Sequence, residues 1–167
     1  FSFGNIKYLP NKIACLNFAN NILPRINVYN KNIKFIIIGE ISNIDKNFLS
    51  KNKNIKVLGS QKNLKMILKN SICGISNLEI STGFQSKILT YMSFGLPVIC
   101  SLKSFNETGF KKDKEILVYK NNFSFINLIL RLKKNKIKSN LLSNNGLKTI
   151  KLNYNWNKVL FSYIKIK

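Results

Sequence analysis

The run KFIIIG at residues 34–39 restricts the possible fold more than any other feature of the sequence. A strand with one face in water alternates apolar and polar residues, whereas FIII is apolar without interruption. Such a run predicts a strand that is covered on both faces, as the strands of a parallel sheet are. The chain is therefore expected to be an α/β protein with helices on both sides of its sheet.

Strand-like and helix-like patterns alternate along the rest of the chain. Further strands are predicted at residues 1–3, 55–59, 71–76, 98–99 and 116–119. Helices are predicted from Pro10 to a break at Pro24, over 45–50, 63–69 and 123–135, from a turn at Gly83 to Gly95, and within 138–164 with breaks near Gly146 and Asn153; residues 103–114 are expected to form a polar excursion. This order predicts a doubly wound, mostly parallel, Rossmann-like sheet with C-terminal helices, in one domain over residues 1–167.

The chain is strongly basic, with 28 Lys and Arg residues against 6 Asp and Glu residues and a formal net charge of +22. This charge favours an anionic partner, either nucleic acid or a membrane surface. A bias toward Lys, Asn and Ile in every segment accounts for the same excess without a partner. The sequence contains no RNP-like aromatic motif or helix-turn-helix pattern, so no nucleic acid is expected, and a nucleic-acid-binding domain is the less favoured alternative.

Cysteine usage and hydropathy indicate the compartment. Cys15, Cys73 and Cys100 lie in apolar surroundings at unrelated spacings, and the sequence has no histidine. They predict small buried residues in a reducing, cytoplasmic compartment, and they support neither a disulfide framework nor a metal site. No apolar run has the length of a membrane span. Because the chain begins with Phe1 inside a predicted strand, a fragment of a longer protein is expected.

Residues 81–101, STGFQSKILTYMSFGLPVICS, predict a loop, a helix and a strand in succession. Gly83 forms the turn that opens the helix, and a helix N-terminus presents unpaired N–H groups and a partial positive charge. This turn therefore suits an anion such as a phosphate. Earlier strands also end at glycines, Gly4, Gly39 and Gly59, and ligands of such sheets bind beyond the carboxyl ends of the strands. A binding site is expected at that edge.

Five stretches of the chain carry a resemblance to a known family. They are GNIKYLPNKIACLNFANNILPRI at residues 4–26, FIIIGE at 35–40, IKVLGS at 55–60, TGFQSKILTYMSFGLPVICS at 82–101 and NYNWNKV at 153–159. Together they resemble the C-terminal, nucleotide-sugar-binding domain of a GT-B glycosyltransferase of the family 4 type, the glycosyl transferases group 1. The fourth stretch is similar to the pattern GxQxKxLExMxxGxPVxxS of one subgroup and is the most specific of them.

The resemblance implies sugar transfer from a nucleoside diphosphate to an acceptor, with retention of configuration and without a metal. It implies no cofactor beyond the nucleotide-sugar donor, and a role in cell-envelope polysaccharide or glycolipid synthesis, peripheral to the inner face of the plasma membrane. The acceptor would bind an N-terminal domain that this chain lacks, so the fragment is expected to be inactive alone.

The same resemblance assigns residues to roles. Lys87 and Lys7 are the implied catalytic residues, which offset the charge of the leaving diphosphate, with Lys12 close to them. The implied substrate-binding residues are Gly4, Asn5, Gly59, Ser60, Thr82, Gly83, Phe84, Gln85 and Thr90. Among these, residues 83–85 are expected to offer backbone N–H groups to the diphosphate.

Thr82 and Thr90 occupy the positions of two glutamates that many members of the family carry. The threonine at the first position is usual in this subgroup, but the second is a departure, because the glutamate there binds the ribose hydroxyls. A threonine loses that charge-assisted hydrogen bond. A catalytically degenerate nucleotide-sugar-binding module is therefore an alternative function.

Apolar residues around the unit are expected to be structural. Ile88, Leu89, Met92 and Phe94 follow a helical spacing that places them in the core. Tyr91 and Tyr8 are expected to pack rather than stack on a base, and Trp156 to anchor the terminal helices.

Overall fold

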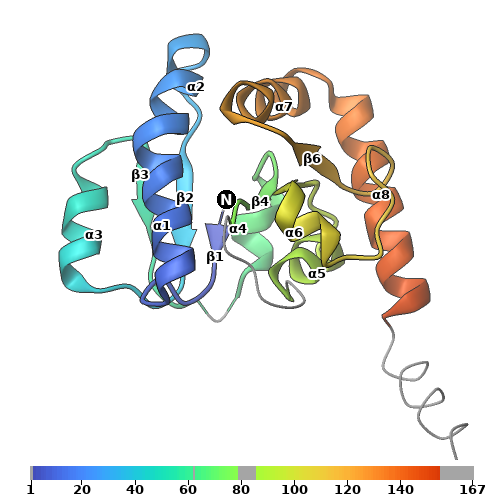
Figure 1. The fold of residues 1–167 in the computed structure, drawn as a ribbon, viewed down its shortest axis with the longest axis horizontal. Helices are drawn as coiled ribbons and strands as arrows, with labels where there is room; N and C mark the ends of the chain where they lie inside the picture. Colours follow the sequence, from blue (N-terminus) through green and yellow to red (C-terminus); the bar gives the residue numbers. More distant parts are fainter. Residues whose placement is uncertain (1, 62, 79–85, 155–167) are drawn as a thin grey trace, which may run out of the picture.

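A computed structural model describes residues 2–61, 63–78 and 86–154 (Figure 1). The strands are β1 (Ser2–Phe3), β2 (Phe35–Ile38), β3 (Ile55–Val57), β4 (Gly74–Ser76), β5 (Val98–Ser101) and β6 (Leu117–Tyr119). The helices are α1 (Leu9–Asn17), the π-helix η1 (Phe18–Ile22), α2 (Leu23–Tyr29), α3 (Asn43–Ser50), α4 (Lys65–Lys69), α5 (Ser86–Ser93), α6 (Leu102–Asn106), α7 (Asn122–Lys134) and α8 (Lys136–Asn153). Strand and helix alternate as predicted, so the α/β class is confirmed.

The strands pair in parallel throughout, in the orders β1-β2-β3 and β4-β5-β6. Each group of three strands forms one sheet. Because β1 contacts β4, the strands lie across the molecule in the order β3-β2-β1-β4-β5-β6. The predicted doubly wound, parallel arrangement is confirmed. In the described part of the chain, the ladder of strand hydrogen bonds is interrupted between β1, which is only two residues long, and β4.

Both faces of the sheets are buried, as the FIII run predicts. Ile37 and Ile38 are neighbours in β2, are 0% and 2% exposed, and belong to different apolar clusters. Ile99 and Cys100 in β5 divide between the same two clusters. Because successive side chains of a strand point to opposite faces, each central strand contributes to two cores at once.

The predicted helix break at Pro24 is wrong, because the helix continues through this residue as far as Tyr29. The backbone widens to a π-helix at η1, where the N–H of Leu23 donates to the carbonyl of Phe18, five residues earlier. Proline lacks an N–H, and its ring clashes with the carbonyl four residues before it in an α-helix. The wider turn accommodates both effects without ending the helix.

Two further boundaries differ from the prediction. The polar excursion begins with the short helix α6, because Ser101 caps it by accepting a hydrogen bond from the N–H of Ser104 at 3.2 Å. Gly146 does not break α8; it lies where a Cβ atom would come within 3.3 Å of Met92 Cγ. Glycine there lets α8 pack closely on α5.

The ends of the molecule complete the fold. In Figure 1, α3 and α8 lie at opposite ends, on either side of the two sheets. Among the described helices, none has the length and apolar character to cross a membrane. Cys15, Cys73 and Cys100 are buried, as predicted. The predictions for Trp156 and for the chain beyond residue 154 lie outside the described residues.

Candidate functional site

Three glycines stack at the carboxyl ends of β1, β2 and β3. Gly4 and Gly39 have φ angles of +140° and +132°, which side chains rarely tolerate. A Cβ atom on Gly39 would lie 1.9 Å from the carbonyl oxygen of Gly4, and its N–H donates to the carbonyl of Gly59 at 2.9 Å. The backbone itself therefore forms this edge, with no room for a side chain at Gly39.

The loop after β1 is held by side-chain amides. Asn5 Oδ1 accepts a hydrogen bond from the N–H of Lys7 at 2.9 Å, and Asn11 Nδ2 donates to the carbonyl of Asn5 at 2.9 Å. Pro10 lies in the first turn of α1, where its fixed φ suits a helix start. The side chain of Asn11 is thus turned back toward the carboxyl end of β1.

Lys87 is the charged group at the centre of this edge. It is the second residue of α5, and its ammonium donates to Asn11 Oδ1 at 2.7 Å. A Cβ atom on Gly4 would lie 4.0 Å from Lys87 Nζ, so the ammonium lies directly beside the end of β1. Lys87 therefore brings α5 of one sheet to the glycine loop of the other.

Burial lowers the pKa of Lys87 below its usual value, because desolvation disfavours the charged form. Cys15 opposes this shift weakly, although burial raises the pKa of its own thiol to about 11, so the thiol is neutral at pH 7. The salt bridges of the described residues are formed by other lysines, Lys7 with Glu40 and Lys12 with Asp45. Within the described chain, no carboxylate pairs with Lys87.

The helix that carries Lys87 is fixed at both its flank and its end. The ring of Tyr91 packs on Gly74, where a Cβ atom would come within 2.4 Å of the ring, and its hydroxyl donates to the carbonyl of Ile75 at 3.3 Å. At the C-terminus, Gly95 has a φ angle of +66°. The N–H of Gly95 donates to the carbonyl of Met92, and the N–H of Leu96 donates to the carbonyl of Tyr91. This is a Schellman cap, and it confirms the predicted helix end at Gly95.

Buried polar groups join the two halves behind the site. Asn77 Nδ2 donates to the carbonyl of Ala14 in α1 at 2.8 Å. The Ser101 hydroxyl donates to the carbonyl of Leu78 at 2.7 Å, which ties the loop after β4 to the end of β5. Ser104 Oγ accepts from Ser76 Oγ at 3.4 Å and is completely buried. The first of these bonds joins the two halves, and the other two tie together the strand ends of the second sheet.

Other predicted site residues are placed less centrally. Lys7 forms an exposed salt bridge of 3.5 Å with Glu40. Lys12 lies 2.8 Å from Asp45, and the hydrogen bond from Lys12, with a second from Ser42, lowers the pKa of that carboxyl group. The charge of Lys12 is therefore already balanced.

The remaining predictions divide between described and undescribed residues. The Thr90 hydroxyl donates to the carbonyl of Ser86 at 3.1 Å, one turn back in its own helix. Ser60 is exposed, directly after Gly59. Residues 82–85, which carry Thr82, Gly83, Phe84 and Gln85, lie outside the described residues.

The packing predictions hold for most of the apolar residues. Ile88, Tyr91 and Met92 are buried, and Leu89 packs partly buried against the same cluster. Phe94 is 44% exposed and Tyr8 is 54% exposed, so the prediction that they pack in the core is wrong. Tyr8 precedes α1 at the turn of the loop, and Phe94 lies just before the cap at Gly95, where the helix surface meets solvent.

Sequence reasoning placed Gly39 at the predicted binding edge but assigned no role to Asn11 or Asn77. Asn11 belongs to the quoted GNIKYLPN stretch and Gly39 ends the FIII strand, so their positions were marked, but their contacts span distant segments. Asn77 carried no signal, because a lone asparagine after a strand is typical of an ordinary turn.

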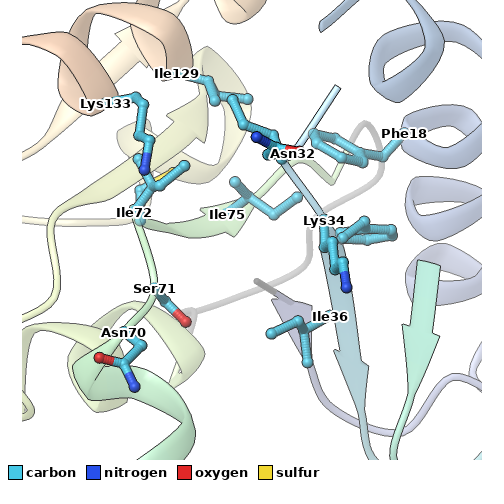
Figure 2. A pocket seen from close by; sticks show the side chains of 13 residues that line it. Phe18, Asn32, Lys34, Ile36, Asn70, Ser71, Ile72, Ile75, Ile129 and Lys133 are labelled. Carbon is cyan, nitrogen blue, oxygen red and sulfur yellow. The ribbon is translucent and has the colours of Figure 1, made fainter. Parts of the chain in front are cut away.

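A cavity of about 270 Å³ lies away from this edge, between β2 and β4 (Figure 2). Phe35 and Ile36 of β2 and Ile75 of β4 are among its lining residues. Lys34 and Lys133 also line it and are exposed. None of the described site residues lines it. The cavity lies between the two sheets, beside the amino-terminal ends of β2 and β4. It is therefore separate from the candidate site at the carboxyl ends.

Comparison with known proteins identifies the class of this chain. Residues 1–135 match the model of the glycosyl transferases group 1. The chain belongs to this family. A search of functionally curated proteins gave no significant match.

Solved structures share the fold of the chain. TarM is 18% identical, with a TM-score of 0.79 over 98% of this chain and 33% of its own. The Anabaena HepE structure in complex with UDP is 11% identical, with a TM-score of 0.79 over 99% of this chain and 47% of its own. The C-terminal domain of LpcC, a glycosyl transferase group 1 family protein from Francisella tularensis, is 15% identical, with a TM-score of 0.70 over 93% and 84%. The chain thus has the Rossmann-like fold of a GT-B C-terminal domain and spans a third to a half of TarM and HepE.

Proposed function

We propose that this chain binds the diphosphate of a nucleotide sugar at the carboxyl ends of its strands. The observation that supports the proposal is the partly buried Lys87 ammonium, which is bonded at 2.7 Å to a neutral amide and has no carboxylate partner among the described residues. A diphosphate would supply the missing counter-charge through charge-assisted hydrogen bonds. The similar HepE structure contains UDP, which is a ligand of this chemical kind.

Within a whole enzyme, this domain would present the donor for glycosyl transfer. The acceptor oxygen bonds the anomeric carbon as the bond from that carbon to the phosphate oxygen breaks. The nucleoside diphosphate leaves with the electron pair, and the acceptor proton passes to a base. Lys87, the positive end of α5 and Lys7 would stabilise the charge that develops on the leaving oxygen. We place the acceptor and the base in a second domain, because the chain spans only 33% of TarM and 47% of HepE.

Metal independence and retention of configuration belong to the same proposal. The lysine ammonium supplies positive charge where a divalent cation would otherwise act. Transfer by the whole enzyme should therefore persist in excess EDTA, and NMR of the first-formed product should show the anomeric configuration of the donor. Loss of transfer in EDTA that Mg²⁺ or Mn²⁺ restores would contradict the metal-independent mechanism.

Donor binding is tested directly with this chain. A thermal-shift panel of UDP, GDP and their sugars should show stabilisation that rises with ligand concentration, because ligands that bind the native state stabilise it. Lys87→Met should abolish most of the shift, whereas Lys46→Met, which removes an exposed lysine of α3, should preserve it. The second variant controls for general attraction to a chain of net charge +22. Equal shifts in both variants would contradict the proposed site.

A separate surface supports the proposal of a membrane-facing role. A hollow beside α2 is lined by Lys31, Lys34 and Lys53, and Val28 and Tyr29 next to it are 77% and 74% exposed. Basic side chains around exposed apolar ones favour an anionic bilayer surface. We propose that this surface contacts the anionic leaflet when the whole enzyme works on a lipid-linked or cell-envelope acceptor.

A further inference from the structure

We infer that Asn11 is the positioning residue of the site: it aims the Lys87 ammonium at the donor diphosphate and, being neutral, leaves the charge of that ammonium free. This inference rests on the proposed function. It begins from the two hydrogen bonds of one amide. Nδ2 of Asn11 donates to the carbonyl of Asn5 at 2.9 Å, and Oδ1 accepts from Lys87 Nζ at 2.7 Å.

These two contacts determine the orientation of the Asn11 amide. In the opposite orientation, the NH₂ group would face an ammonium and the amide oxygen would face a carbonyl oxygen, so both hydrogen bonds would be lost. The Asn5 end is itself fixed, because the N–H of Ile6 donates to the carbonyl of Glu40 at 2.7 Å and the side chain of Ile6 is 1% exposed. Asn11 therefore transmits the position of the β1 loop to the Lys87 side chain.

The neutrality of Asn11 matters as much as its shape. An ammonium has three N–H donors, so after one hydrogen bond to Asn11 two remain for phosphate oxygens. An aspartate of the same size would neutralise Lys87, repel a diphosphate and set a carboxylate against the carbonyl of Asn5. An alanine would leave the ammonium without its acceptor. Asparagine is the side chain that positions the charge and does not compensate it.

The experiment compares Asn11→Asp and Asn11→Ala in the full chain. The pKa of Lys87 is followed by NMR titration of the lysine side chains, with Lys87→Arg used to assign the signal. Because an adjacent carboxylate favours the charged form, Asn11→Asp should raise this pKa. Asn11→Ala should lower it further, because it removes a hydrogen bond to the charged form. Cys15 is the titratable group that acts on Lys87 from α1, and both variants leave it in place.

Affinity for inorganic pyrophosphate provides the second measurement, and it is independent of the base and the sugar. Both Asn11 variants should weaken binding about tenfold or more, which is the usual effect of losing a hydrogen bond to a charged group. Asn21→Asp adds the same negative charge at an exposed position of η1 and should leave both the pKa of Lys87 and pyrophosphate affinity near wild type. A merely structural role for Asn11 would not move the pKa of Lys87 in opposite directions.

The outcomes test the positioning role of Asn11 and the proposed function separately. If Asn11→Asp leaves the pKa of Lys87 unchanged in a folded protein, the positioning role is wrong. If both variants bind pyrophosphate as the wild type does, it is wrong as well. If the pKa of Lys87 responds as expected but wild-type protein binds neither pyrophosphate nor UDP nor GDP, the contact is confirmed and the proposed function fails.

Discussion

The side-chain amide of Asn77 donates a hydrogen bond of 2.8 Å to the main-chain carbonyl of Ala14, and both groups are buried. This bond joins the end of β4 to α1 across the gap where the two sheets meet. The carbonyl of Ala14 also accepts the N–H of Phe18, so Asn77→Ala removes one of its two hydrogen bonds and should lower the free energy of unfolding by about 1 kcal/mol. Urea denaturation measures the change, with Asn47→Ala on the exposed surface of α3 as the control. A loss no larger than that of the control would contradict the bridging role.

Three glycines provide a graded test of the strand-end geometry. Gly109 has open space around it, Gly59 has φ +65° with open space, and Gly39 has both φ +132° and the carbonyl of Gly4 at 1.9 Å from a Cβ position. Alanine should be nearly neutral at Gly109 and cost about 1 kcal/mol at Gly59. At Gly39 it should cost more than about 3 kcal/mol or prevent folding, because backbone rather than a flexible side chain would have to move. Thermal melts of the three variants should follow this order, and a mild effect at Gly39 would show that the loop contact is loose.

Thr90→Glu tests whether the ribose contact is missing. The Thr90 hydroxyl is bonded to its own helix at Ser86, and a glutamate would extend beyond it with a carboxylate that ribose hydroxyls can bond. Affinity for UDP or GDP should rise about tenfold, whereas affinity for pyrophosphate, which has no ribose, should fall slightly by repulsion. Unchanged nucleotide affinity would show that the threonine site functions without the acid, and would weaken the degenerate-module alternative.

Because the Lys87 charge is desolvated, we expect it to lower the stability of the fold while it supports anion binding. Folding lowers the pKa of Lys87 below its ordinary value of 10.5, so between the folded and unfolded pKa values the unfolded chain binds more protons. Stability contributed by this residue therefore rises as the pH rises through that window, and at neutral pH the charge is a net cost. Lys87→Met should raise the melting temperature at pH 7 and reduce pyrophosphate affinity. A lower melting temperature would show that the hydrogen bond to Asn11 outweighs the cost of burying the charge.

Vesicle binding tests the membrane-facing surface. The wild-type chain should co-sediment with phosphatidylcholine vesicles only when they contain phosphatidylglycerol, and binding should weaken as salt increases. Replacing Lys31, Lys34 and Lys53 by Gln should reduce binding more than replacing Lys111, Lys112 and Lys114, which are exposed before β6. Tyr29→Ser should reduce it further, and Ile137→Ser, at another exposed apolar residue, should not. Equal losses from both lysine sets would indicate attraction by net charge alone.

The sequence predicted elements better than it predicted contacts. The FIII run implied burial on both faces, and Ile37 and Ile38 do enter separate cores. The break expected at Pro24 failed because a proline acts on one α-helical hydrogen bond, and the chain removes that conflict by widening locally into η1. No local sequence pattern indicates that a π-helix will form before Pro24.

The site itself was only partly predictable. Lys87 could be singled out because its motif lies at a helix start, where anions bind. Its partner Asn11 could not, because an asparagine after proline at a helix start has an adequate local explanation and the bond depends on how two sheets dock. Gly39 shows the same limit, since a glycine at a strand end is common and only the approach of Gly4 makes it obligatory.

The hydrogen bond between Lys87 and Asn11 joins residues that are 76 positions apart in the chain. Asn11 lies in α1 and Lys87 in α5, which pack with different sheets, so the contact requires both sheets to be folded and in place. The proposed anion affinity would then be a property of the folded molecule, in which both sheets are in place. Under the proposed function, a nucleotide sugar would therefore stabilise only chains whose two halves have already assembled.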